Sequence, residues 1–74
     1  MTYYMIHETY GLLDYNDHEL IADKDSAYRL FNQLRERILS REKISEVYTD
    51  EEGELYVEAD ECAIKIYVTE HTIQ

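Results

Sequence analysis

The sequence is poor in basic residues, in cysteine and in glycine, and it contains no long apolar run. Its 74 residues include seven Lys or Arg against seventeen Asp or Glu, which gives a net charge of −10. Direct binding to DNA, RNA or an anionic membrane requires a basic surface, so the charge argues against all three. Because no run of about eighteen apolar residues exists, we expect no segment that spans a bilayer.

The low content of cysteine and glycine indicates the cellular compartment and excludes some kinds of binding site. A single cysteine, Cys62, cannot form an internal disulfide and fits a reducing compartment. The first ten residues lack the basic start and apolar stretch of a signal peptide, so we expect an intracellular, cytoplasmic protein. Two glycines cannot build a glycine-rich phosphate loop. A chain of this length has room for one domain, covering residues 1–74.

The clearest predicted element is a helix from about Lys24 to about Glu42. Apolar residues recur in it with a spacing that places them on one stripe. Asp23 suits the N-cap position, and the acidic first turn and basic last turn suit the helix dipole. The stripe consists of Ala27, Leu30, Phe31, Leu34 and Ile38.

After the helix the apolar period changes to two, which predicts three short strands. These strands are expected at residues 44–49, 54–59 and 62–69. Asp50-Glu51-Glu52-Gly53 fits a four-residue hairpin loop in which Gly53 supplies a positive φ, and Asp60-Glu61 fits a second tight turn. Both connections are short, so the three strands should pair in order as an antiparallel meander.

The first 22 residues are less regular. Residues 3–8 resemble a strand, and a second short strand is expected within residues 12–22. The candidates for its position are Leu12-Leu13 and Leu20-Ile21, with turns at Gly11 and Asn16-Asp17. The sequence therefore predicts an α+β fold, in which a single α-helix packs on one face of a small, mainly antiparallel sheet in the order β-β-α-β-β-β.

Alternation assigns the strand side chains to two faces. The set expected to pack on the helix is apolar: Val47, Leu55, Val57, Ala59, Cys62, Ile64, Ile66 and Val68. The opposite face interleaves carboxylates with three tyrosines: Glu46, Tyr48, Glu54, Tyr56, Glu58, Lys65 and Tyr67. Residues 1–23 carry −5, residues 24–43 carry +3 and residues 44–74 carry −8. The acid is therefore concentrated outside the helix, on the sheet and its turns.

No set of residues suggests catalysis or a cofactor. His7, His18 and His71 are far apart in the chain and lie in no recognisable motif. Cys62 falls on the inward face, where a buried thiol is more typical than a nucleophile. The sequence also lacks the G-x-S-x-G and H-E-x-x-H patterns. We therefore expect a non-enzymatic protein.

Two groups of residues resemble metal sites but have simpler interpretations. Asp50, Glu51, Glu52 and Glu54 offer oxygens for Ca²⁺ or Mg²⁺, but their order does not match an EF-hand loop, which favours a solvated turn. Cys62 with a histidine lacks the ligand spacing of zinc sites. The sequence therefore predicts no metal and no cofactor.

The Tyr/Glu face has two interpretations. Cross-strand tyrosines stabilise a sheet, and neighbouring charges keep it soluble. Exposed tyrosines are also favoured anchors at interfaces, and carboxylates select basic partners. On the second interpretation, the predicted contact and steering residues are Glu46, Tyr48, Asp50, Glu51, Glu52, Glu54, Tyr56, Glu58, Asp60, Glu61 and Tyr67.

The leading hypothesis is a binding protein that engages a basic protein surface. A nucleic-acid-binding groove is one such surface, which would make the chain a nucleic-acid mimic. In charge, size and absence of catalytic motifs the chain resembles the small acidic inhibitors that phages make against host nucleases and other defence proteins. This likeness involves no residue pattern, so it implies no site residues.

Two alternatives remain. In the first, the chain is a self-associating structural subunit, such as a homodimer, and its acids are only solubilising. In the second, which ranks last, Arg29, Arg37 and Arg41 of the helix bind an acidic peptide.

Overall fold

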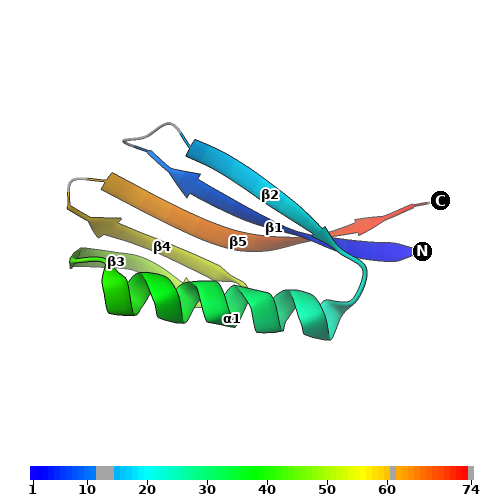
Figure 1. Cartoon of the computed structure of the whole chain (residues 1–74). Helices are drawn as coiled ribbons and strands as arrows, with labels where there is room; N and C mark the ends of the chain where they lie inside the picture. The colour runs from blue at the N-terminus through cyan, green and yellow to red at the C-terminus, as the bar shows by residue number, and fades with distance from the viewer. Residues whose placement is uncertain (12–14, 61, 74) are drawn as a thin grey trace.

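The computed structural model describes residues 1–11, 15–60 and 62–73, in which a five-stranded sheet carries one helix across one face (Figure 1). The elements are β1 (Thr2–Tyr10), β2 (Tyr15–Ile21), α1 (Lys24–Arg41), β3 (Ile44–Glu51), β4 (Glu54–Ala59) and β5 (Cys62–Thr72). Neighbouring strands are all antiparallel, in the spatial order β2-β1-β5-β4-β3. The predicted α+β class and order of elements are confirmed.

Helix α1 begins and ends where local chemistry favours it. The Asp23 carboxylate accepts hydrogen bonds from the Ser26 backbone N–H at 2.9 Å and the Ser26 hydroxyl at 2.8 Å, as an N-cap should. At the other end Glu42 is the C-cap, and its N–H donates to the Ile38 carbonyl at 3.0 Å. The helix therefore ends at Arg41, one residue before the predicted end.

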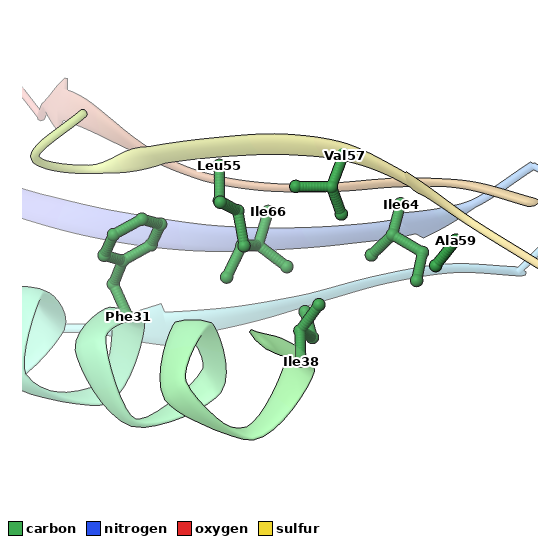
Figure 2. Packing of buried hydrophobic residues seen from close by; sticks show 7 residues of the cluster. All are labelled: Phe31, Ile38, Leu55, Val57, Ala59, Ile64 and Ile66. Atoms are coloured by element: carbon green, nitrogen blue, oxygen red, sulfur yellow. The ribbon is translucent and has the colours of Figure 1, made fainter. Parts of the chain in front are cut away.

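The core lies between α1 and the central strands. Phe31 and Ile38 point from the helix toward β4 and β5 (Figure 2). The strand residues that meet them are Leu55, Val57, Ala59, Ile64 and Ile66, each at most 2% exposed. Cys62 is half-buried at the border of this cluster and is a free thiol. Val47 is opposite Val57 but stays 51% exposed, because it lies on an edge strand.

The β3–β4 connection is shorter than predicted. Glu51 pairs with Glu54, so the turn consists of Glu52 and Gly53 alone, and Asp50 and Glu51 belong to β3. The prediction of a four-residue loop at residues 50–53 was wrong, because the strand pairing continues further than the apolar alternation. The positive φ of Gly53 is confirmed at +83°.

We expect Gly53→Ala to lower the free energy of unfolding by about 1–2 kcal/mol, because a left-handed φ costs an L-residue that much. A Cβ at Gly53 would also lie 3.0 Å from Tyr28 Cε1. Gly11→Ala is the matched control, since its Cβ would meet Ala63 at an ordinary 3.6 Å, and it should change stability by less than about 0.5 kcal/mol. Urea unfolding measures both, and equal losses would contradict the strained turn.

The other turns and strand ends differ from the predictions in detail. Asn16 and Asp17 pair with Thr9 and Glu8 inside β2, so the predicted turn there was wrong. Of the two positions proposed for this strand, Leu20-Ile21 lies in β2, whereas Leu12-Leu13 lies outside the described residues. Ala59 pairs with Cys62 across the second turn, in which Asp60 has a φ of +52° and Glu61 lies outside the described residues.

Among the described residues, the face of the sheet opposite α1, which we call the open face, carries no helix (Figure 1).

The same residues include no helix that is both long enough and apolar enough to cross a membrane.

Candidate functional site

The open face gathers most of the residues that the sequence analysis singled out. Leu55 and Val57 of β4 are buried toward α1, so the alternate residues of β4 and their partners on β3 and β5 lie on the opposite side. The predicted residues that the register places there are Glu46, Glu51, Glu54, Tyr56, Glu58 and Tyr67. Tyr48 has no strand partner, but its contacts with Tyr56 and Glu58 place it on the same face.

Tyr48 and Tyr56 form a pair of rings on neighbouring strands. Their centroids are 4.9 Å apart, with the ring planes at 38°. The Tyr48 hydroxyl donates a hydrogen bond to Glu58 Oε2 at 2.7 Å. This bond, together with partial desolvation and the charges of Glu46 and Glu58, raises the pKa of Tyr48 to about 12. Tyr48 therefore stays a neutral phenol at physiological pH, beside two carboxylates.

Lys65 lies among the next rings along the face. Its ammonium is 5.0 Å from the centroid of Tyr67 and 5.9 Å from that of Tyr56. It is also 3.7 Å from Glu54 Oε1. Both distances to the rings are within the range of a cation–π interaction. The open face thus holds one cation of its own, between two tyrosines and a carboxylate.

The three histidines, which are far apart in the chain, also come together on the open face. His7 pairs with His18 across β1 and β2, and the rings are 6.3 Å apart. His7 Nε2 is hydrogen-bonded to Thr69 Oγ1 at 2.9 Å, and the same oxygen lies 2.7 Å from His71 Nε2. Tyr3 stacks on His71 with centroids 5.0 Å apart. Strand pairing joins these residues, although they are far apart in the chain.

Burial and mutual repulsion bear on the charge of this group. Burial lowers the pKa of His7, and the charges of His18 and His71 lower it further. The ring of His7 also stacks on Tyr67, with centroids 4.5 Å apart and planes at 9°. The folded protein therefore favours the neutral form of the His7 ring.

A row of rings consequently crosses all five strands. It runs from Tyr48 on β3 through Tyr56 on β4 and Tyr67 on β5 to His7 on β1 and His18 on β2. We call these five residues the aromatic row. Lys65 lies between its second and third members. At about 4.8 Å per strand, the row is roughly 19 Å long.

Three of the other predicted residues do not lie on the open face. Asp50 is opposite Leu55 on the helix side and accepts two hydrogen bonds from Arg35 of α1, both at 2.7 Å. This contact lowers the pKa of Asp50 and raises that of Arg35. Glu52 and Asp60 occupy turns at opposite ends of β4. These three positions offer charge but no shared surface, and the remaining predicted residue, Glu61, lies outside the described residues.

A second acidic region lies on the helix side, which the sequence analysis did not identify. Glu8 is opposite Asp17 on the β1–β2 hairpin, and Glu19 follows on the same face. They border a hollow of about 60 Å³ whose apolar lining is Ile6, Leu30 and Leu34. Burial raises the pKa of Glu8, as do Asp17 and Glu19, whereas Arg37 lowers it. One of the helix arginines thus already interacts with a carboxylate of the chain.

Among residues 1–11, 15–60 and 62–73, no three His, Cys, Asp or Glu side chains are placed to hold a metal ion. Comparison with family models, with curated proteins and with solved structures finds no match to this chain. The site must therefore be judged on its own geometry.

Proposed function

We propose that the chain is a small, non-enzymatic protein that binds a basic protein surface through its open face. One observation carries this proposal: exposed tyrosine rings and carboxylates are in direct contact on a sheet face without a helix. Tyr48 is 49% exposed and Tyr56 is 36% exposed, although both are large aromatic residues. Tyrosines of this kind are common anchors of protein interfaces, because they offer apolar area and a polar tip.

The charge of the face selects the partner. The open face carries four carboxylates, those of Glu46, Glu51, Glu54 and Glu58. Lys65 is the one lysine or arginine in residues 44–74. A cationic surface would be steered toward these carboxylates and would meet the rings between them. The groove of a nucleic-acid-binding protein has this character. Glu54 and Glu58 are about 13 Å apart along β4, a spacing that is compatible with the phosphates of a nucleic acid.

The test compares two charge-reversed proteins in affinity capture from cell extract at low salt. Glu54→Lys with Glu58→Lys changes the open face, whereas Glu36→Lys with Glu42→Lys makes the same net change at exposed positions of α1 and its C-cap. We expect the open-face variant to capture basic proteins in amounts at least about tenfold lower than the unchanged protein does. The reason is that like charges in contact cost over about 1.4 kcal/mol of binding free energy. The helix variant should retain them.

Stepped elution with salt and identification by mass spectrometry complete the measurement. Captured basic proteins should elute as the salt concentration rises, because screening weakens exposed charge pairs. Equal capture by the two variants would contradict the proposal. Binding would then depend on the net charge of the chain and not on the open face.

Self-association is the second candidate function, and one feature of the sheet favours it. Edge strand β2 pairs with β1 without a register shift from Tyr15 to Ile21, whereas the other edge strand, β3, contains two shifts. A regular edge is suited to pairing with a second copy. Light scattering at several concentrations separates the two functions, because a constant monomer mass would exclude self-association.

A further inference from the structure

The chain's own lysine shows what kind of group the open face accepts. The Lys65 ammonium lies over Tyr67 and Tyr56 and faces the Glu54 carboxylate at 3.7 Å. Two aromatic rings and one carboxylate therefore surround this cation. The arrangement is a cation–π site in which the bound cation is a lysine of the same chain.

The neighbouring part of the face has the same components and shares Tyr56 with the Lys65 site. Tyr48 and Tyr56 supply the rings, and Glu46 and Glu58 supply the carboxylates. In the part of the chain that the structure describes, no lysine or arginine lies over the Tyr48 ring. The hydroxyl of Tyr48 donates to Oε2 of Glu58, which leaves Oε1 for another donor. The Tyr48 side of this pair is therefore a second cation site, which the described lysines and arginines do not fill.

We propose that the open face takes up an arginine side chain of its basic partner against Tyr48 and Tyr56, with Glu46 and Glu58 as counter-ions. The inference rests on the proposed function and names the contact that the partner makes. Arginine fits better than lysine for two reasons. Its planar guanidinium stacks on aromatic rings, and its several N–H groups donate to two carboxylates at once.

Tyr48 offers an incoming cation a protonated phenol ring. Its pKa, raised to about 12, keeps the phenol protonated at neutral pH. The two glutamates place negative charge beside the ring without changing it to a phenolate. An incoming guanidinium would then meet an electron-rich ring and two carboxylates within one strand spacing, about 4.8 Å.

The experiment titrates the isotopically labelled full chain with octa-arginine and, separately, octa-lysine, and follows the NMR signals of the tyrosine rings and glutamates. We expect the signals of Tyr48, Tyr56 and Glu58 to shift most, and the arginine peptide to bind more tightly. Tyr48→Leu should weaken octa-arginine about two- to fivefold, the value of an exposed cation–π contact. Tyr48→Phe keeps the ring and should bind nearly as well as the unchanged protein.

Tyr3→Leu is the matched control, since Tyr3 lies on the same face but stacks on His71 at the opposite end. Core methyl signals report whether each variant is folded. Equal affinity of Tyr48→Leu and Tyr3→Leu, or equal binding of the two peptides, would overturn the arginine site. If the arginine site is overturned but the Glu54→Lys and Glu58→Lys variant still fails to capture basic proteins, the proposed function stands without this site. If that variant captures basic proteins as well as the unchanged protein does, the arginine site and the proposed function both fail.

Discussion

Phe31→Ala is expected to remove about 3–5 kcal/mol from the free energy of unfolding, the usual cost of deleting a fully buried phenylalanine side chain. Phe31 is 1% exposed and lies between α1 and the strand residues Leu55 and Ile66 (Figure 2). A chain of this length has a total stability of roughly 4–11 kcal/mol. The loss is therefore a large share of the total, and at the lower end of this range the variant would be mostly unfolded.

Urea unfolding followed by circular dichroism measures the effect. The midpoint should fall while the slope, which reports the surface exposed on unfolding, stays the same. Gln33→Ala is the matched control, because Gln33 lies on the exposed side of the same helix, and it should change stability by less than about 0.5 kcal/mol. A Phe31→Ala midpoint equal to that of Gln33→Ala would mean that α1 does not pack through this stripe.

This core could be predicted because its pattern is unambiguous. Ala27, Phe31 and Ile38 recur at helical spacing, and Leu55, Val57 and Ala59 alternate along a strand. In both segments the buried side is apolar and the exposed side is polar, so local preference and tertiary packing agree. Where one side of an element is buried in this way, the sequence specifies both the element and its orientation.

The position and length of strand β2 could not be predicted, for the opposite reason. Its sequence is rich in Asn, Asp, His and Glu, and residues such as Asn16 and Asp17 are typical of turns. It is an edge strand, and residues 17–20 are exposed, so it needs little apolar surface. Its backbone is held by pairing with β1, which a local sequence pattern does not reveal.

The position of Asp50 shows how one extra residue changes a surface. Simple alternation after Glu46 and Tyr48 predicts that Asp50 shares their face. The register shifts between Val47 and Thr49, so Tyr48 is an additional residue in β3. Because such a bulge reverses the sides of the residues that follow, Asp50 faces α1 and binds Arg35. No sequence signal marks the bulge.

The histidine group depends on even longer-range information. His7 lies opposite Tyr67 only because β1, near the N-terminus, pairs with β5, near the C-terminus. The two strands are separated in the chain by every other element. The alternation of residues 3–8 places His7 on one side of its strand, but only the pairing of β1 with both β2 and β5 gives it His18 and His71 as neighbours.

His7 should make binding of a basic ligand depend on pH between 7.5 and 5.5. Burial and the charges of His18 and His71 lower the pKa of His7 from 6.5, so the folded protein favours the neutral ring and the unfolded chain binds more protons. The stability that this ring contributes is therefore complete above pH 6.5 and falls as the pH decreases through 6.5 and then through the lowered pKa. As the pH decreases through that lowered pKa, the His7 ring on the open face becomes positive.

A cationic ligand that crosses the aromatic row would then meet the positive charge of His7. This repulsion costs roughly 0.5 kcal/mol at 8 Å in water, before screening by salt. It should weaken the binding of octa-arginine about twofold at low salt. Isothermal titration calorimetry at pH 7.5, 6.5 and 5.5 measures the loss, with the fold monitored at each pH by circular dichroism.

Two controls assign the effect to His7. The His7→Gln variant cannot gain this charge, so its affinity should change little over the same range. Tri-arginine, at most about 11 Å long, cannot span the roughly 14 Å from Tyr48 to His7, so a tri-arginine ligand held at Tyr48 should lose less affinity than octa-arginine. An equal loss in the glutamine variant would mean that the carboxylates govern the pH dependence. Equal losses for the two peptides would mean that the ligand does not lie along the row.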